Sequence, residues 1–506
     1  MGSKVAIATG KDRVQAVRTA FQYLGGIEQW VKPGYKVLIK PNVMTAMGTP
    51  TVTHIDVIKG LILLCQEAGA GEITVAENSV CGMSPRVHFE YAGYTRAIED
   101  LGAQVHFFDE GEWVYVAKPD NYCLQDMHLP RKLMEADVWI TVPVAKTHES
   151  TLTTLGIKNS HGILPDEDKA RHHRTRPESG SSLWDKFVDI LATKKPDLCV
   201  TDMYEAMEGQ GPAFGSIVTM KLIVASSDVV ACDAVVEALM GLDNLEGPLT
   251  RLAHERGLGV GDINQIEIVG EPLAEHRRPF ARAVSDPVIN CPPGLTILRG
   301  DVCKGGCQMP LRYAIDVSNI IYAKDHQEFG DVYILVGMYP PPPPEDKFVV
   351  AFGDCAIYTT WHYSYRQKPK KVGPWFNPRR GYVDVIGCCP LGLVWVHELK
   401  NLTKGYAPMV LMAGGSVGAF EEPSANFNFG TGVPPEKQPR RWHWDRKFAE
   451  RFAKEIAESK PATYIYAANE SMKGKARPEV ARNITSQPAY VADPTSRALR
   501  AKGGIR

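Results

Sequence analysis

The stretch that decides the fold runs from residue 137 to residue 173 and reads DVWITVPVAKTHESTLTTLGIKNSHGILPDEDKARHH. Its first part, Val138–Val142, is short and apolar, which is typical of a central parallel strand that is buried on both faces. Pro143 cannot donate a hydrogen bond to a sheet ladder, so we expect the strand to end there. The polar groups that follow then lie at the carboxyl end of the strand, where open α/β sheets place their ligand crevices.

The residues beyond Pro143 are dense in groups that can hold an anion or move a proton. These groups are Lys146, His148, Lys158, Asn159, His161, His172 and His173. Taken singly, each could be a solvated residue, because loops are normally polar. Their concentration in one stretch, broken by Gly156 and Gly162, favours an active or ligand-binding site over that alternative.

The size and composition of the chain indicate a globular protein with more than one domain. At 506 residues the chain is too long for one ordinary hydrophobic core, so we expect two or three domains. The apolar fraction of 44%, the charged fraction of 23% and the net charge of -1 predict no general attraction to nucleic acid or membrane. We find neither a long apolar run nor the apolar core of a secretory signal, which predicts a cytoplasmic protein.

Strand and helix patterns alternate through the first half of the chain. This alternation predicts an α/β domain over residues 1–275, with a parallel sheet and helices on both faces. The expected strands are residues 4–8, 36–40, 73–76, 104–108, 138–142, 198–202, 220–225 and 266–269. The expected helices are residues 13–24, 55–68 with Thr53 as N-cap, 91–101, 183–192 and 229–240.

The composition changes twice in the second half. A segment rich in proline and charge predicts a domain boundary near residues 271–295. We expect a smaller, cysteine-bearing α+β domain over residues 290–432, followed by a helix and an extended tail over residues 433–506.

From Pro434 onward there are sixteen Lys and Arg against eight Asp and Glu. Because such a tail cannot form a core of its own, we expect it to pack across the interface of a homo-oligomer, most simply a twofold dimer. The alternative is a solvated tail.

Two further strand ends would reach the crevice beyond Val142. Lys40 and Asn42 follow one strand, before a helix start whose backbone amides favour anions. Glu77 and Asn78 leave the next strand at the same level. Each could also belong to an ordinary βα loop.

Three acids precede a glycine-rich turn in TDMYEAMEGQGPAFG, namely Asp202, Glu205 and Glu208. Paired carboxylates of differing burial can act as acid and base or hold a metal. The alternative is that they are caps and solvated groups, which is the commoner role for acids near a turn.

The motifs VLIKPN, VPVAKTH, GIKNSHG, TDMYEAMEGQGP and SSDVVACDAV, in this order over about residues 4–270, resemble the family of the domain of unknown function 362. The resemblance implies the fold and a site but no substrate. Some relatives carry a ferredoxin-like module with closely spaced cysteines, and this chain has no such run. The family's signature positions fall on Lys40, Asn42, Lys146, His148, Lys158, Asn159, Asp202, Glu208 and Gly209.

The cysteines divide into two groups. Those in the first half lie mostly in apolar segments and are interpreted as small buried hydrophobes without chemistry: Cys65, Cys81, Cys123, Cys199 and Cys232. Those of the second half lie in glycine-rich stretches: Cys291, Cys303, Cys307, Cys355, Cys388 and Cys389. Four thiolates drawn from three loops can hold a 4Fe–4S cluster or a structural zinc. We favour the cluster, with Cys303, Cys307, Cys355 and one of the Cys388–Cys389 pair as ligands, over zinc and over free thiols.

We hypothesise an iron–sulfur enzyme, an oxidoreductase or a lyase, that acts on a small anionic or carbonyl-bearing substrate. Its catalytic residues would be Lys146, His148, Lys158, His161, His172 and Glu208. Lys40, Asn42, Asn159 and Asp202 would bind the substrate, and an electron-donor protein would be a partner.

Two alternatives stay open. One is a racemase-like enzyme with another metal cofactor, because the order of lysine, glycine and histidine over 158–173 resembles the nickel-pincer lactate racemases. The other is a non-catalytic binding or assembly protein with structural zinc.

Overall fold

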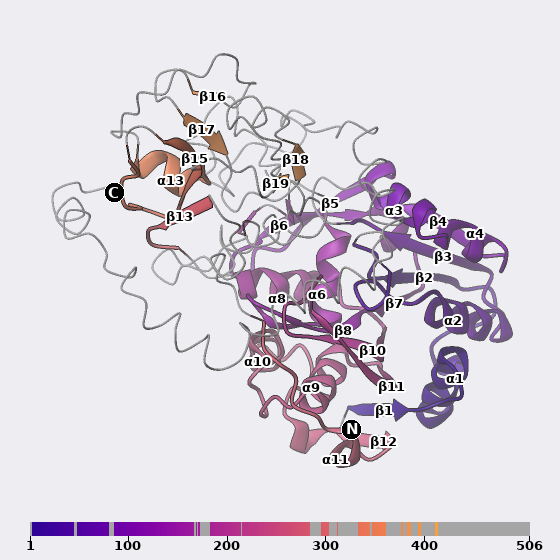
Figure 1. The fold of residues 1–506 in the computed structure, drawn as a ribbon. Coiled ribbons are helices and arrows are strands. Elements are labelled where there is room, and N and C mark those ends of the chain that lie inside the picture. Colours follow the sequence, from indigo (N-terminus) through magenta and orange to yellow (C-terminus); the bar gives the residue numbers. More distant parts are fainter. Residues whose placement is uncertain are drawn as a thin grey trace. The chain divides into compact units, whose positions relative to one another are not determined.

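The computed structural model describes residues 3–44, 48–79, 85–165, 168–169, 171–172, 183–213, 215–283, 295–302, 311, 332–344, 347–360, 376–377, 382–385, 393–395 and 410–412. These residues fall into two compact units, one formed by residues up to 283 and the other by residues from 295 onward. Figure 1 shows both.

A ten-stranded sheet forms the centre of the first unit. Its strands are β1 (Lys4–Ala8), β2 (Lys36–Pro41), β3 (Glu72–Glu77), β4 (Gln104–Phe107), β7 (Val138–Val142), β8 (Val144–His148), β9 (Leu152–Thr154), β10 (Leu198–Glu208), β11 (Ser216–Ser226) and β12 (Glu267–Gly270). The main order is β12-β1-β11-β10-β7-β2-β3-β4, and β8 pairs with β10 and β9.

The pairing is mostly parallel, so the predicted α/β class is confirmed. Strands β10, β7, β2, β3 and β4 run parallel to their neighbours in that order, as β12 does to β1. Strand β11 is antiparallel to both β1 and β10. The glycine-rich turn joins β10 to β11 as a hairpin, and a short connection of this kind can make only an antiparallel pair. The sheet is therefore mixed rather than wholly parallel.

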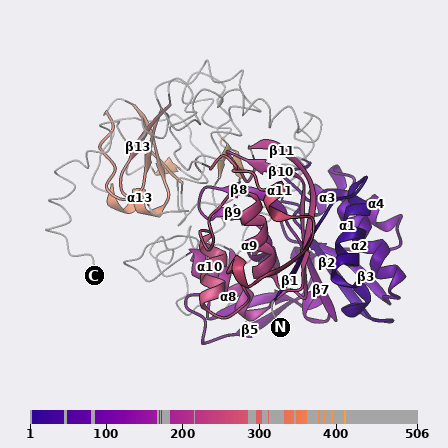
Figure 2. The same cartoon turned by 90° about the horizontal axis from the view of Figure 1, so that it is seen from below.

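Helices cover both faces of this sheet, as the two views in Figures 1 and 2 show. They are α1 (Arg13–Leu24), α2 (Ile55–Glu67), α3 (Pro85–Tyr91), α4 (Tyr94–Glu99), α5 (Arg131–Met134), α6 (Gly156–Asn159), α8 (Leu183–Thr193), α9 (Val229–Leu239), α10 (Pro248–Glu255) and α11 (Leu273–His276). Val5 and Ile7 of β1 pack in one core with residues of α8 and α9, whereas Ala6 and Ala8 pack in a second core with α1 and α2. Since successive strand residues point to opposite faces, this alternation buries the sheet on both sides.

Two local predictions were wrong. The single helix expected over 91–101 is divided into α3 and α4 around Gly93, whose φ of 74° lies in the left-handed region. The N-cap of α2 is His54 rather than Thr53, and His54 Nδ1 accepts a hydrogen bond from the amide of Asp56 at 3.1 Å.

Pro143 separates two strands. Strand β7 ends at Val142, as predicted, but β8 begins directly at Val144 and pairs with β10 and β9. Lys146 and His148 therefore lie on a strand and not on a loop. Because they are two residues apart, both side chains point to the same face of β8.

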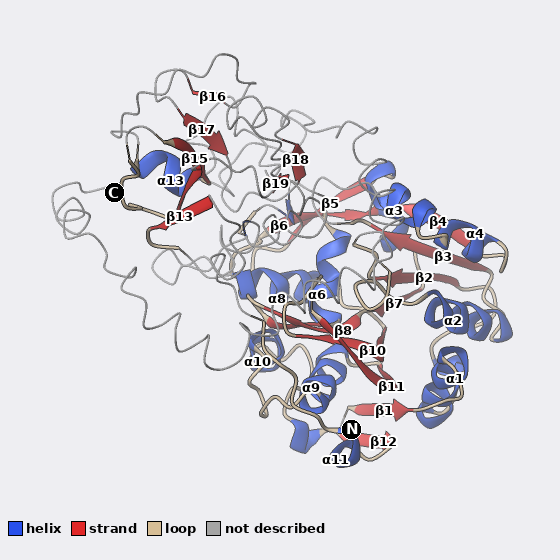
Figure 3. Cartoon of the chain, viewed as in Figure 1, coloured by secondary structure: helices blue, strands red, loops and turns tan. Residues whose placement is uncertain are grey.

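Smaller elements complete the first unit, and Figure 3 shows them by type. A two-stranded sheet consists of β5 (Trp113–Ala117) and β6 (Asp126–Pro130). Four 3₁₀ turns are described there: η1 (Ile27–Gln29), η2 (Phe108–Glu110), η3 (Ser160–Ile163) and η5 (Ile263–Gln265). Across the ranges given above, we find no helix with the length and apolar character needed to cross a bilayer.

The second unit contains a five-stranded sheet of order β13-β14-β15-β17-β16. Its elements are β13 (Leu295–Arg299), β14 (Val332–Val336), β15 (Phe348–Phe352), α13 (Asp354–Thr359), β16 (Phe376–Asn377), β17 (Tyr382–Val385), and the separate pair β18 (Leu393–Trp395) and β19 (Val410–Met412). Strands β13, β14, β15 and β17 run parallel. The tail over 433–506 and the cysteines Cys81, Cys291, Cys303, Cys307, Cys388 and Cys389 lie outside the described residues.

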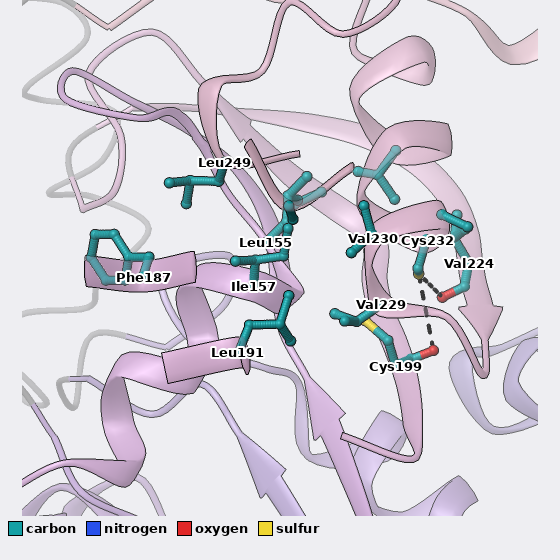
Figure 4. Packing of buried hydrophobic residues seen from close by; sticks show 14 of the residues in the cluster. Leu155, Ile157, Phe187, Leu191, Cys199, Val224, Val229, Val230, Cys232 and Leu249 are labelled. Carbon is teal, nitrogen blue, oxygen red and sulfur yellow. Dashed lines mark hydrogen bonds between the residues drawn. The ribbon is translucent and has the colours of Figure 1, made fainter. Parts of the chain in front are cut away.

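Figure 4 shows the core of the first unit around Cys199 and Cys232. Both thiols are buried, and Cys232 Sγ lies 3.6 Å from the carbonyl oxygen of Val224. Burial raises the pKa of the Cys199 thiol far above its ordinary value. These two cysteines are therefore packing residues, as the sequence predicts.

We predict that Leu191→Ala lowers the free energy of unfolding by about 2–5 kcal/mol, because it removes methyl groups from a side chain that packs in this core and leaves a cavity. Leu191 is 1% exposed. Met134→Ala is the control, since Met134 is 42% exposed. Urea unfolding followed by tryptophan fluorescence measures both, and equal losses in the two variants would contradict the packing described.

Candidate functional site

The carboxyl ends of β2 and β3 bring a buried lysine against a buried carboxylate. Lys40 and Glu77 form an ion pair, and both side chains are nearly inaccessible to water. Lys40 Nζ also donates to the carbonyl oxygen of Pro41 at 3.0 Å and to Asn159 Oδ1 at 3.2 Å. Burial lowers the pKa of Lys40 and raises that of Glu77, although each charge favours the other.

Asn159 connects this pair to the neighbouring strand. Its amide nitrogen donates to Thr141 Oγ1 at 2.9 Å and to the carbonyl oxygen of Lys40 at 3.3 Å. Glu77 Oε1 accepts a hydrogen bond from the amide of Val43 at 3.1 Å. The ends of β2, β3 and β7 are thereby joined to helix α6 by polar side chains.

Lys146 on β8 is the second buried lysine of the site. Its ammonium donates to Asn42 Oδ1 at 2.6 Å and to the carbonyl oxygen of Thr51 at 2.8 Å. Both acceptors are neutral, so they solvate the ammonium without balancing its charge. Burial, with a smaller contribution from the positive charge of Lys158, lowers the pKa of Lys146 to about 7.

Lys158 and His161 share an aromatic neighbour. Lys158 Nζ lies 5.4 Å from the centroid of the Phe187 ring, and the His161 ring lies 5.0 Å from the same centroid. A cation over an aromatic face is attracted to it but receives no hydrogen bond. Burial lowers the pKa of Lys158 to about 8. Its ammonium therefore retains the capacity to donate hydrogen bonds to a ligand.

His148 has a defined neutral tautomer. The amide of Ser150 donates to His148 Nδ1 at 3.1 Å. A nitrogen that accepts a hydrogen bond carries no proton, so the neutral ring holds its proton on Nε2. His148 can therefore present Nε2–H on the face of β8 that Lys146 shares.

Two hydroxyl groups beside these residues are orphaned. Thr51 Oγ1 and Ser150 Oγ are buried and have no hydrogen-bond partner within the described part of the chain. Buried hydroxyls without a partner are uncommon, and each calls for a water molecule or a ligand. Thr51 adjoins Lys146 through its carbonyl oxygen, and Ser150 adjoins His148 through its amide.

Two further lysines belong to this edge, and the sequence reasoning missed both. Lys169 Nζ donates to the carbonyl oxygens of Ser79 at 2.5 Å and Asn78 at 3.4 Å. Lys186 Nζ donates to the carbonyl oxygen of Lys169 at 2.5 Å. Both lysines are buried. In the sequence, Lys169 is one charge within the run DEDKAR, which is typical of a solvated segment, so no local signal distinguishes it.

An ion-pair network holds the backbone beside Lys169. Asp168 accepts hydrogen bonds from the amide of His128 at 2.7 Å and from the guanidinium of Arg171 at 3.0 Å. Arg171 also forms an ion pair with Asp126 at 2.6 Å. The side-chain hydrogen bond with Asp168 raises the pKa of His128. Strand β6 thus fixes the segment that carries Lys169.

The three acids of β10 do not form a common site. Asp202 accepts from the amides of His54 and Tyr204 at 3.1 Å each, Glu205 pairs with Arg13 at 2.5 Å, and Glu208 pairs with Arg278 at 3.2 Å. Burial raises the pKa of Asp202 to about 6. Glu208 also accepts from the amide of Ala281 at 3.1 Å, so it holds the segment after α11. The hypothesis of an acid–base pair or metal among them therefore finds no support in their contacts.

The other predicted residues take separate positions. His172 lies in a turn with a φ of 52°, four residues beyond Asp168. Cys355 lies in the first turn of α13, in the second unit. Within the described residues, no three His, Cys, Asp or Glu side chains gather closely enough to hold a metal ion.

Comparison with known proteins agrees with the motifs. Residues 37–237 match the family described as "Domain of unknown function (DUF362)". The thylakoid-associated protein sll1697 of Synechocystis is 32% identical over 243 residues, which cover 48% of this chain and 74% of that protein.

Two solved structures show a weak likeness. The lactate racemase apoprotein of Thermoanaerobacterium thermosaccharolyticum is 12% identical with a TM-score of 0.34, over 66% of this chain and 68% of that one. A protein of Thermotoga maritima is 12% identical with a TM-score of 0.30, over 68% of this chain and 71% of that one. At these TM-scores the two likenesses carry no argument about function.

We predict that sulfate, used as a simple anion, binds beside Lys146 and Lys158 and that its affinity falls as the pH rises. A lysine is charged below its pKa, and the pKa values of Lys146 and Lys158 are about 7 and about 8. Raising the pH through this range removes positive charge, whereas the charge of sulfate stays constant. Isothermal titration calorimetry between about pH 6 and pH 9 measures the affinity, and an affinity that does not change across the range would refute the prediction.

Proposed function

Because the chain belongs to the family of the domain of unknown function 362, whose name states no activity, we propose a function from the geometry of its site. The first unit is an enzyme domain that binds a small anionic or carbonyl-bearing substrate at the carboxyl edge of its sheet. The observation that carries this proposal is the burial of several ammonium groups at one edge.

Charge supports an anionic ligand. Lys40 is balanced by Glu77, but Lys146 donates to two neutral oxygens, and Lys158 lies over an aromatic ring near the carboxylate of Glu149. A buried charge is costly unless an opposite charge approaches it. A carboxylate or phosphate between Lys146 and Lys158 would supply that charge. The orphaned hydroxyls of Thr51 and Ser150 would supply further hydrogen bonds.

Proton transfer is the chemistry that these residues support best. Lys146 and Lys158 have pKa values near neutral pH, which is where a general acid or base works efficiently. His148 carries a proton on Nε2 in its neutral form and can donate it to a substrate oxygen. The lysines would therefore offset the substrate charge while His148 or a neutral lysine moves a proton.

We further propose that the cysteines of the second unit hold a 4Fe–4S cluster, with zinc as the alternative occupant. The strand order supports this proposal. Strands β13, β15 and β17 run parallel, and in the sequence a cysteine follows each of them within a few residues: Cys303, Cys355 and Cys388. Because parallel strands have their carboxyl ends at one edge of the sheet, the chain leaves all three strands at that same edge. When bound, the cluster would supply an electron or a Lewis acid.

We propose an oxidoreductase or lyase in the cytoplasm, a twofold dimer through the tail over 433–506, and an electron-donor protein as partner.

We predict that Lys158→Met and His148→Ala leave the fold intact, because neither residue belongs to the two apolar clusters that form the core of the first unit. Lys158→Met should weaken sulfate binding about tenfold or more, since it removes an ammonium that has no hydrogen-bonding partner among the described residues. Lys36→Met is the matched control: Lys36 is exposed at the opposite end of the strand that carries Lys40. Calorimetry measures binding and thermal unfolding measures stability. Equal sulfate affinities in Lys158→Met and Lys36→Met would sink the anion site.

We also predict that Cys303→Ser and Cys355→Ser lose bound metal, because serine oxygen is a poor ligand for metals that prefer thiolate. Cys199→Ser and Cys232→Ser are the controls, since both residues are packed in the first unit. Elemental analysis and absorbance near 400 nm measure iron and zinc. Metal retained in both cysteine variants of the second unit would contradict the proposed ligands.

A further inference from the structure

Helix α9 contacts the turn that carries Lys158 and Asn159 through two buried carboxylates. Asp233 Oδ1 accepts from the amide of Gly156 at 2.8 Å, and Asp233 Oδ2 accepts from the amide of Ile157 at 2.9 Å. Glu237, one helical turn further on, accepts from Thr153 Oγ1 at 2.9 Å. Residues four apart on a helix share a face, so both acids hold the same segment.

This segment depends on those contacts for its position. Helix α6 has four residues, and a helix of one turn is not stable by itself in water. The first amides of any helix have no partner within the helix. In α6, the carboxylate of Asp233 bonds two of them, and hydrogen bonds to a charged acceptor are stronger than neutral ones.

The backbone at Gly156 lies against α9 without space for a side chain. A Cβ atom at Gly156 would lie 2.6 Å from Val229 Cγ2, 2.7 Å from Cys199 Sγ and 2.9 Å from Asp233 Oδ1. Figure 4 shows Ile157 in the same buried cluster as Leu191 of α8 and Val229 of α9. The turn is therefore fixed on one side by apolar packing and at its start by a carboxylate.

The far end of the same turn carries groups of the anion site. Asn159 bonds Thr141 Oγ1 and the backbone of Lys40, and Lys158 lies over the Phe187 ring. Because α6 is so short, a displacement at Gly156 moves Lys158 and Asn159 as well.

We propose that Asp233 is a positioning residue of the anion site, and that Asp233 and Glu237 together set the place of the Lys158 ammonium. This inference rests on the proposed function. The carboxylate touches no ligand and acts through the amides of Gly156 and Ile157. Burial raises the pKa of both acids, that of Glu237 to about 7, so charging them on one buried face of α9 costs free energy. A positioning role is consistent with this cost.

The test compares Asp233→Asn with Asp228→Asn. Asparagine preserves the size of the side chain but replaces one acceptor oxygen by a donor, which then faces an amide of α6. Asp228 is the matched control on the same helix: it caps α9 by accepting from Val230 at 3.0 Å and Ala231 at 3.3 Å, and none of its hydrogen bonds reaches the site.

Two measurements report on the site. Calorimetry with sulfate measures anion affinity, and the pH dependence of acetylation by acetic anhydride, read by mass spectrometry, measures the pKa of Lys158. We expect both variants to lose thermal stability. Asp233→Asn should bind sulfate at least tenfold more weakly and move the acetylation midpoint of Lys158 from about 8 toward the ordinary value of 10.5. Asp228→Asn should change neither.

The outcomes separate the inference from the proposed function. If the parent protein does not bind sulfate, the anion site fails, and the acetylation midpoint still tests the role of Asp233. If Asp233→Asn retains the parent's acetylation midpoint, or if Asp228→Asn shifts it equally, the positioning role is overturned. Should Asp233→Asn not fold, Thr153→Val removes the donor to Glu237 and tests the same turn, with a shifted midpoint expected.

Discussion

A lysine ammonium that is removed from water must gain partners, lose its proton or attract an anion, and this constraint governs the carboxyl edge of the first sheet. Lys40 satisfies it with Glu77, at the ends of two adjacent parallel strands. Lys169 satisfies part of it with backbone carbonyl oxygens. Lys146 donates to neutral oxygens, Lys158 lies over an aromatic ring near the carboxylate of Glu149, and burial lowers the pKa of both lysines. This composition is the basis on which we propose a ligand that brings negative charge.

The surrounding fold holds these groups in place against their mutual repulsion. Parallel pairing of β7, β2 and β3 brings three strand ends to one level, so that Asn159 can bond to two of them. Strand β6 orders the segment of Lys169 through Asp168, and α9 orders the turn of Lys158 through Asp233. The site therefore depends on β6 and α9, which hold its lysines in place without contributing a side chain to it.

Local patterns predicted most of the framework and part of the site. The apolar run before Pro143 marks a buried strand, and the position of Lys146, His148, Lys158 and Asn159 after it follows from the general geometry of α/β sheets. Patterns of this kind cannot reveal partners that are distant in the chain. Lys169 bonds to residues about ninety positions away, and nothing near it in the sequence indicates burial. The contacts of Glu208 could not be predicted for the same reason, because its partner Arg278 belongs to a later segment. The antiparallel course of β11 required knowledge that the glycine-rich turn closes a hairpin.

Anomalous diffraction from crystals of the full chain soaked in selenate tests the central claim most directly, because selenate has the shape and charge of sulfate and its position can be measured without assumptions about the reaction. We expect one strong selenium peak within hydrogen-bond distance of the Lys146 and Lys158 ammonium groups, with Thr51 or Ser150 donating a hydroxyl hydrogen bond. Selenate found only at exposed lysines elsewhere, and none at this edge of the sheet, would contradict an anion site here.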